Sequence, residues 1–421
     1  MRYEAISPYL FSKNREKILA QMPQNSIAVI HSNDAMPRNG DLFFPFRQQS
    51  DLFYASGIEQ EESILLFVPY ASDPNKRVQL FILKPDEKLE IWEGKKLTPL
   101  EAQKISGIQT VLSEKEFYTT FAEYAKKSEI IYINQNENPR FTSPVSSRDE
   151  RFKPYVQQKY PKHEIRSLAP ILCKCRLIKE PEEIELISKA CAITREGFLE
   201  VCSRIKPGMK EYHIEAILSE VFISHGASGH AFEPIVASGK NACYLHYTKN
   251  NSLLESGTLV TIDFGAEYAN YASDCTRAIP VNGEFSKRQK QIYMSVLRAF
   301  KQTKKIITAG TTIQNIHSEA CKYIEEELLL LGLITKQDIA TQKAKSPAYF
   351  TYFMHGVSHF LGLDTHDVGE KDVVLEPGMV LTCEPGIYVL QEEIGIRLEN
   401  TILVTTDGNK DLMDNIPFIE E

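Results

Sequence analysis

Residues 259–279 read LVTIDFGAEYANYASDCTRAI and contain two strand-like runs, Leu259–Phe264 and Tyr271–Ile279. Each run is mostly apolar and carries one acidic side chain, Asp263 in the first run and Asp274 in the second. Two strands joined by the short connection between them can fold back as a hairpin, which would present both carboxylates on one face. Taken alone, each aspartate is also typical of a turn or a helix cap.

Helical patterns lie on both sides of this stretch. A helix is predicted to begin at Pro181, because proline suits the first helical turn and the glutamates after it suit the positive end of the helix dipole. This helix is predicted to end at Lys206-Pro207-Gly208. Further helices are predicted over 211–225, 287–308 and 313–331, and further strands over 379–383 and 394–404. Two rounds of a helix pair followed by a strand pair predict an α+β domain with an antiparallel sheet backed by helices.

The N-terminal part of the chain has a different pattern. The apolar runs ESILLFVPY (62–70) and VQLFILKP (78–85) are bounded by turn residues and predict strands. Residues 134–161 are polar and contain several prolines, which predicts a loop. We therefore expect two domains, residues 1–174 and residues 175–421.

Composition excludes several classes of protein. The 421 residues include 48 Lys+Arg and 56 Asp+Glu, and this net charge of −8 argues against a nucleic-acid partner. No apolar run approaches the length of about 18 residues that a membrane-spanning helix needs, and charges interrupt the first residues too often for a secretory signal. The eight cysteines are scattered without zinc-site spacing, so we expect reduced thiols and a cytoplasmic protein.

The segment HGVSHFLGLDTHD (355–367) holds three of the ten histidines, His355, His359 and His366. A neutral imidazole is a common metal ligand and a ready proton-transfer group. The glycines within the segment predict an irregular backbone that aims side chains rather than a helix. Because no HExxH pattern is present, a thermolysin-like zinc site is not indicated.

Two glutamates lie in or beside apolar runs further on, Glu384 in VLTCEPGIY and Glu399 in GIRLEN. A carboxylate in a buried strand is costly unless a cation compensates it. A metal ion would do so, and so would Arg397, which lies two residues from Glu399 on the same strand face. A buried Arg–Glu pair is therefore the alternative interpretation for that site.

Taken together, these side chains predict a metal centre. Four carboxylates and one imidazole suit a hard or borderline divalent ion such as Mn²⁺. Four carboxylates exceed what one ion needs and fit a two-metal centre, which would generate hydroxide at neutral pH and stabilise an oxyanion. This chemistry hydrolyses an amide or a similar bond. The candidate ligands are Asp263, Asp274, Glu384, Glu399 and one of the three clustered histidines.

The blocks IDFG…SDCTR, HGVSHFLGLDTHDVG, TCEPGIY and GIRLEN resemble the signature blocks of the pita-bread metallopeptidases, and among these the aminopeptidase P (Xaa-Pro aminopeptidase) family. Residues 237–247 (ASGKNACYLHY) extend the resemblance, and residues 46–57 (FRQQSDLFYASG) resemble the non-catalytic domain of that family. The resemblance implies a C-terminal pita-bread (creatinase/aminopeptidase) domain and an N-terminal α/β creatinase-like domain.

The resemblance also implies roles for individual residues. It implies that His359 is the imidazole ligand, and that two Mn²⁺ ions are held by Asp263, Asp274, His359, Glu384 and Glu399. Asp274 and Glu399 would be bridges, and Glu384 would also be the general base. Arg397 would belong to the catalytic site and would orient the region around Glu399 without binding a metal ion itself. The histidines that would bind substrate or stabilise the tetrahedral intermediate are His246, His355 and His366.

Two aromatic residues match substrate-binding positions of the family. Phe232 would line the pocket, although it is also typical of a plain core residue. Trp92, the only tryptophan, lies in a segment similar to one that caps the site of a neighbouring subunit in some members. The apolar face of an indole suits a proline ring, but a lone tryptophan is also typical of a packing residue.

The implied activity is hydrolysis of the N-terminal Xaa-Pro bond of peptides. Prolidase, which has the same fold and metal site but accepts only dipeptides, is the alternative enzyme. A metal-free binding module of this fold is the alternative of another class, and the presence of all five ligands counts against it. The resemblance further implies a homo-oligomer, a dimer or a tetramer, with no nucleic-acid or membrane partner.

Overall fold

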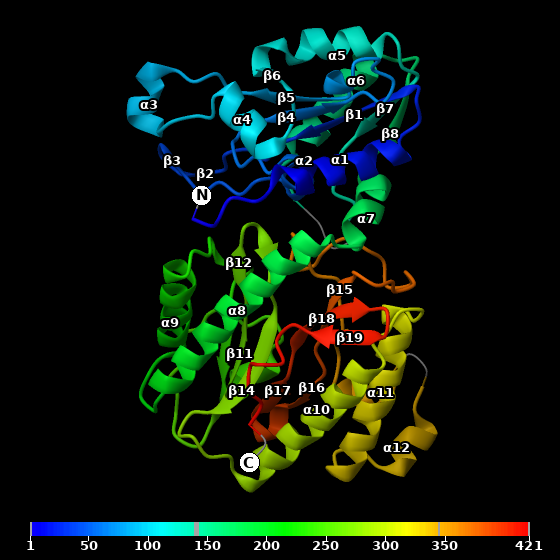
Figure 1. The fold of residues 1–421 in the computed structure, drawn as a ribbon. Coiled ribbons are helices and arrows are strands. Elements are labelled where there is room, and N and C mark those ends of the chain that lie inside the picture. The colour runs from blue at the N-terminus through cyan, green and yellow to red at the C-terminus, as the bar shows by residue number, and fades with distance from the viewer. Residues whose placement is uncertain (1, 139–142, 344–345, 420–421) are drawn as a thin grey trace. The chain divides into compact units, whose positions relative to one another are not determined.

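The computed structural model describes residues 2–138, 143–343 and 346–419 and divides into two compact units. One unit comprises Glu4–Arg176, and the other comprises Leu177–Glu421 together with the first three residues. Figure 1 shows the elements of each unit. No helix among the described residues is long and apolar enough to cross a membrane.

The N-terminal unit is built on a six-stranded mixed sheet. Its central strand β1 (Ser26–His31) is antiparallel to one neighbour and parallel to the other. Every residue of β1 is buried, as expected for a strand covered on both faces. The strand order is β6 (Thr110–Ser113), β5 (Val78–Ile82), β4 (Ile64–Phe67), β1, β7 (Ile130–Ile133) and β8 (Glu164–Ser167).

Helices and a short hairpin accompany this sheet. The hairpin is formed by β2 (Pro37–Asn39) and β3 (Leu42–Phe43). The helices are α1 (Pro8–Gln21), α2 (Ser50–Ser56), α3 (Glu87–Glu93), α4 (Pro99–Ser106), α5 (Phe117–Ala125), α6 (Arg148–Lys159) and α7 (Ala169–Leu177).

Helix α6 shows that the predicted loop over 134–161 was wrong in its second half. A capping box forms between Ser147 and Glu150, and this pair fixes the start of the helix. Phe152 and Val156 are the apolar side chains that bury the helix in the core. Most other positions of α6 are polar, so the sequence lacked a clear apolar period.

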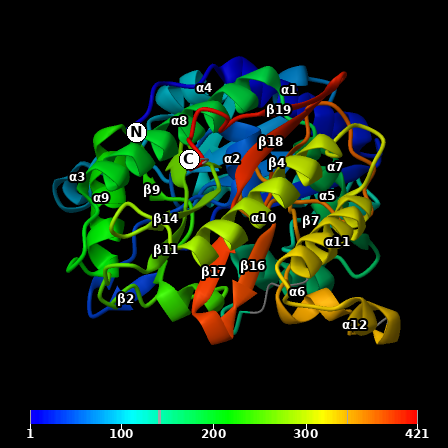
Figure 2. The same cartoon turned by 90° about the horizontal axis from the view of Figure 1, so that it is seen from below.

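The C-terminal unit has its long helices where the sequence predicted them. They are α8 (Pro181–Arg204), α9 (Glu211–Ser224), α10 (Lys287–Lys305) and α11 (Ile313–Leu330), with the shorter α12 (Lys336–Thr341) after them. The helices pack in pairs, α8 with α9 and α10 with α11. In the view from below, α10 crosses the hairpin of β16 (Gly386–Val389) and β17 (Ile394–Arg397), which it contacts (Figure 2).

The predicted hairpin of two acidic strands is confirmed. Strand β11 (Leu259–Phe264) pairs antiparallel with β14 (Cys275–Pro280) on one side and with β10 (Ile235–Ser238) on the other. The chain between β11 and β14 forms two short strands of a second sheet, β12 (Ala266–Tyr268) and β13 (Tyr271–Ala272), beside β9 (Gly229–His230).

Several predicted strands are broken in two in the structure. The run over 271–279 contains β13 and β14, and the run over 394–404 contains β17 and β18 (Asn400–Thr405). Strand β18 pairs with β15 (Val380–Cys383) and β19 (Gly408–Asp411), whereas β17 pairs with β16. Asp274, Glu384 and Glu399 all lie at junctions where the chain leaves one sheet and enters another.

The junction at which the chain passes from β11 to β12 requires a glycine. A Cβ atom at Gly265, between β11 and β12, would lie 1.8 Å from the carbonyl oxygen of Ser273. Because the obstacle is backbone, a side-chain rotation cannot relieve the overlap. The two strand ends that carry Asp263 and Asp274 can approach so closely only when this position lacks a side chain.

We therefore expect Gly265→Ala to lower the free energy of unfolding of the C-terminal unit by about 3 kcal/mol or more, the upper range for overpacking. The matched control is Ala269→Gly in the adjoining turn, where Ala269 has a φ of 53°. This change relieves left-handed strain and should leave stability unchanged or slightly raised. Guanidinium unfolding of both variants checks the prediction, and a Gly265→Ala variant as stable as the parent would contradict it.

Candidate metal centre

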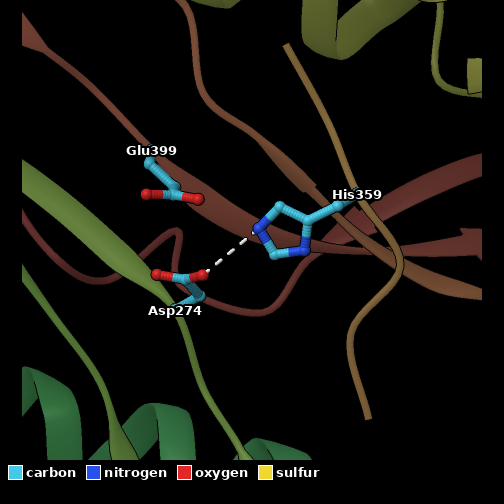
Figure 3. Close-up of side chains that lie close together, drawn as sticks. All are labelled: Asp274, His359 and Glu399. Atoms are coloured by element: carbon cyan, nitrogen blue, oxygen red, sulfur yellow. Dashed lines mark ion pairs between the residues drawn. The ribbon is translucent and has the colours of Figure 1, made fainter. Parts of the chain in front are cut away.

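Three polar side chains from distant parts of the sequence converge in the C-terminal unit. Ligand atoms of Asp274, His359 and Glu399 all lie within 4.8 Å of one another. Figure 3 shows the two carboxylates and the imidazole facing a common space, with Asp274 Oδ2 at 3.4 Å from His359 Nε2. Asp274 precedes β14, Glu399 lies between β17 and β18, and His359 lies in an irregular segment that runs beside β15.

Glu384 and Asp263 complete the acidic cluster. Glu384 Oε1 lies 3.7 Å from His359 Nε2. Asp263 on β11 faces Thr276 on β14, so Asp274, two residues earlier, occupies the diagonal position on the same face. All five predicted ligands are therefore brought together by the fold.

The cluster concentrates negative charge away from water. Burial raises the pKa of Asp274 to about 7, and the charges of Asp263 and Glu384 also raise it. Burial also raises the pKa of Glu399 well above its usual range, with repulsion from the other carboxylates adding to the effect. Burial opposes a charge on His359, but its contacts with Asp274, Glu384 and the carbonyl group of Phe360 together outweigh burial and raise its pKa to about 9. The cluster therefore favours a positive partner.

The details of the donor atoms fit a metal cation. Asp263 Oδ1 and Asp274 Oδ1 are buried and have no hydrogen-bond partner among the described residues. His359 Nδ1 lies 3.0 Å from the carbonyl oxygen of Phe360 and can donate to it, which leaves Nε2 to face the carboxylates. Buried polar atoms without partners are rare in proteins, and a divalent cation would satisfy both oxygens.

Arg397 contacts the cluster through Asp263 and Thr276. Its guanidinium donates to Asp263 Oδ2 at 2.6 Å and to Thr276 Oγ1 at 3.2 Å. Thr276 in turn donates its hydroxyl to Glu399 Oε2 at 2.6 Å. Within the described part of the chain, the ion pair of Arg397 is with Asp263 rather than with Glu399, the alternative considered above. Thr276 links Arg397 to Glu399 by hydrogen bonds, and the charge of Arg397 also lowers the pKa of Glu399.

His355 belongs to the same network. Its Nδ1 lies 2.8 Å from the carbonyl oxygen of Gly356, and its Nε2 lies 2.8 Å from the hydroxyl of Tyr388, which also accepts from Arg397 at 2.9 Å. Burial, followed by the charge of Arg397, lowers the pKa of His355 to about 3. The imidazole is therefore neutral, and it lies 3.6 Å from Glu384 Oε2.

The two other predicted histidines are more exposed. The ring of His366 meets the ring of His359 edge-on, with centroids 4.4 Å apart. His246 lies on an exposed loop and is close enough for its charge to affect the pKa of His355. Both side chains can therefore meet a substrate that approaches the cluster.

The two aromatic candidates differ in setting. Phe232 is half-buried in the link between β9 and β10. Trp92 lies on α3 in the N-terminal unit and is 86% exposed, so it is not a packing residue of that unit.

Sequence reasoning missed two members of the network, Thr276 and Tyr388. Thr276 lies two residues after Asp274, so strand periodicity puts it on the same face, and this signal could have identified it. Tyr388 stands in the TCEPGIY block four residues after Glu384, but no simple pattern predicts that its hydroxyl joins His355 to Arg397.

Comparison with known proteins agrees with this geometry. The model of metallopeptidase family M24 matches residues 185–406, and the model of the aminopeptidase P N-terminal domain matches residues 11–132. The Xaa-Pro aminopeptidase of Escherichia coli is 34% identical over 98% of this chain and 96% of its own length. That of Haemophilus influenzae is 35% identical over 97% of this chain and 94% of its own length.

Solved structures agree as well. Aminopeptidase P from E. coli with the inhibitor Pro-Leu has a TM-score of 0.88 and 32% identity, and covers 98% of this chain and 96% of its own. Aminopeptidase PepP from Pseudomonas aeruginosa has a TM-score of 0.89 and 30% identity, with the same coverage. The chain belongs to metallopeptidase family M24, a family that uses divalent metal ions, and has the two-domain aminopeptidase P fold.

Proposed function

We propose that this metallopeptidase removes the N-terminal residue from peptides whose second residue is proline. The observation that carries the proposal is the convergence of Asp274, His359 and Glu399, with Glu384 beside His359. In the same cluster Asp263 and Asp274 each have one buried oxygen without a partner. The curated relatives that cover almost the whole chain are named Xaa-Pro aminopeptidases, which supports the substrate class.

We assign two Mn²⁺ ions to the centre. Oxygen-rich ligand sets with one imidazole suit Mn²⁺, and four carboxylates balance the charge of two divalent ions. Asp274 and Glu399 would be the ligands shared by both ions, which is supported by the spacing of their ligand atoms, within 4.8 Å of one another and of His359. The proposed ligand set is Asp263, Asp274, His359, Glu384 and Glu399.

Divalent ions supply Lewis acidity, which lowers the pKa of water and stabilises negative charge on a carbonyl oxygen. Within the chain, Glu384 acts as the general base: its carboxylate accepts a proton from water as the water attacks the scissile carbonyl. Burial raises the pKa of Glu384, which makes it a better proton acceptor than an exposed glutamate. His355, kept neutral, lies beside Glu384 and can take part in hydrogen bonding without adding charge.

The remaining polar residues position the substrate. His366 and His246 are exposed beside the cluster, and we assign them to hydrogen bonds with the peptide and with the tetrahedral intermediate. Arg397 holds Asp263 through a 2.6 Å contact and so fixes one ligand. For the proline ring, we propose apolar contacts with Phe232 and, from a second copy of the chain, with the exposed Trp92.

We further propose that the enzyme is a homo-oligomer, a dimer or a tetramer, and that it works in the cytoplasm. The 86% exposure of Trp92 supports a role at a surface that another copy covers. All eight cysteines are free thiols, which supports a reducing compartment. The mass in solution from analytical ultracentrifugation tests the first point, and a monomer would contradict it.

The activity itself is tested by an assay with Mn²⁺ that compares an Xaa-Pro-Leu tripeptide with an Xaa-Pro dipeptide. The E. coli enzyme has been solved with the inhibitor Pro-Leu, the fragment that cleavage of such a tripeptide would leave. We expect the tripeptide to be cleaved at the Xaa-Pro bond. Cleavage of the dipeptide alone would identify a prolidase instead, and no cleavage of either by metal-loaded protein would favour a binding module.

Removal of metal provides a second test. We expect a chelator to abolish turnover and added Mn²⁺ to restore it, with elemental analysis giving two ions per chain. Turnover by a sample shown to be free of metal would contradict the metal centre. A single ion in the fully active enzyme would contradict the two-ion assignment.

Replacement of the proposed base tests its role. We expect Glu384→Ala to lower kcat by about 10³-fold or more, since it removes a group needed in the transition state. Far-ultraviolet circular dichroism should remain unchanged. The control is Glu255→Ala, an exposed glutamate outside the cluster, which should keep full turnover. Near-normal kcat in the Glu384→Ala enzyme would rule out the assignment.

A further inference from the structure

Glu211 is a fully buried carboxylate that none of the roles above uses. It is the first residue of α9, and its side chain and backbone are 0% exposed. No lysine, arginine or histidine forms an ion pair with it among the residues that the structure describes. An isolated buried carboxylate is costly, so other interactions must stabilise Glu211 in the folded protein.

Four hydrogen bonds to Glu211 provide this stabilisation. Oε1 accepts from the backbone N–H of Ser238 at 2.8 Å and from the side chain of Asn241 at 3.0 Å. Oε2 accepts from the hydroxyl of Tyr247 at 2.7 Å and from the backbone N–H of Ser252 at 2.8 Å. The positive end of the α9 dipole favours the same charge. Both oxygens are therefore fully used within the protein.

All four donors belong to one stretch of chain, residues 238–252. This loop begins at the end of β10 and runs back to lie beside the first residue of α9. Ser238 is the last residue of β10, and Asn241 lies in the short 3₁₀-helix η3 (Gly239–Cys243). Ser252 lies at the other end, where it also accepts the backbone N–H of Glu211 at 3.0 Å. One carboxylate thus joins the beginning, the middle and the end of this loop.

His246 lies in this loop, directly before Tyr247. The segment from Tyr244 to Lys249 contains no helix or strand, and His246 is exposed. A loop without regular structure loses about 1–2 kcal/mol of backbone entropy for each residue that is held in place. The contact of Tyr247 with Glu211 therefore limits where the neighbouring imidazole can lie.

We infer that Glu211 is a positioning residue, which holds the loop 238–252 so that His246 stays at the substrate side of the metal centre. The inference rests on the proposed function only for the role of His246. The ordering of the loop by Glu211 is a separate statement that can be tested without any substrate.

Two substitutions separate this role from general support of the fold. Glu211→Gln keeps the shape but turns one oxygen into a donor, so that a backbone N–H of the loop faces another N–H. Tyr247→Phe is milder, because it removes one donor to Glu211, together with the longer 3.4 Å contacts of the same hydroxyl with Asn251 and Ser252, and leaves both backbone donors in place. The matched control is Glu220→Gln, a charge change on the exposed face of the same helix, where Glu220 pairs with Arg204.

The structural arm measures hydrogen exchange of the metal-loaded enzyme. We expect Glu211→Gln and Tyr247→Phe to raise exchange in residues 238–252 and to leave β11 as in the parent, with the metal content unchanged. The control should match the parent throughout. Unchanged exchange in the loop, or loss of metal, would overturn the inference.

The functional arm is a double-mutant cycle with His246→Ala. We expect Glu211→Gln to lower kcat/KM on the Xaa-Pro-Leu tripeptide by about 10²-fold, the effect of a misplaced group. In the His246→Ala background the same change should alter kcat/KM by no more than about twofold, the usual error of additivity. Equal losses in both backgrounds would overturn the role through His246. If the parent enzyme does not cleave the tripeptide, the proposed function fails, and the exchange experiment still decides whether Glu211 orders the loop.

Discussion

The mutual repulsion of buried carboxylates is the constraint on which the C-terminal unit depends. Four acidic side chains share a space that water barely reaches, and burial alone raises the pKa of several of them. Arg397 forms a direct ion pair with Asp263, and its charge also lowers the pKa of Glu384 and Glu399. Divalent cations would stabilise the ionised form of the remaining carboxylates, which fits the occurrence together of residues so costly to bury. Such ions would stabilise the folded unit as well as take part in the reaction.

The fold meets this constraint by breaking its strands. Asp274, Glu384 and Glu399 lie where the chain passes from one small sheet to another, and so the ends of several strand pairs meet around one space. A continuous strand would alternate its side chains between two faces. A junction instead lets the chain change direction and aim one side chain inward, while the neighbouring strands keep their backbone pairing.

Sequence reasoning recovered the long helices and the hairpin of Asp263 and Asp274, because each depends on local period. The choice of His359 to join the four carboxylates came from the family resemblance, and the role of these five residues as ligands stays a prediction. It missed helix α6, because most positions of this helix are polar and its few buried apolar side chains do not form a clear helical period. It predicted β17 and β18 as one strand, because an apolar run does not reveal where the chain stops pairing with one strand and begins to pair with another. It placed Arg397 near Glu399, with a direct pair of the two as the alternative, and did not find the ion pair of Arg397 with Asp263, which is far away in the sequence. A single sequence does not reveal which polar side chains pair with one another when they are far apart along the chain.

The distribution of ligands along the chain has a consequence for biosynthesis. Asp263 and Asp274 are synthesised long before His359, Glu384 and Glu399. A ribosome-bound chain therefore presents an incomplete set of these side chains until Glu399 has been translated. The nascent chain cannot assemble the whole cluster before that point, so the peptidase stays inactive toward neighbouring nascent peptides while the C-terminal unit is still being made.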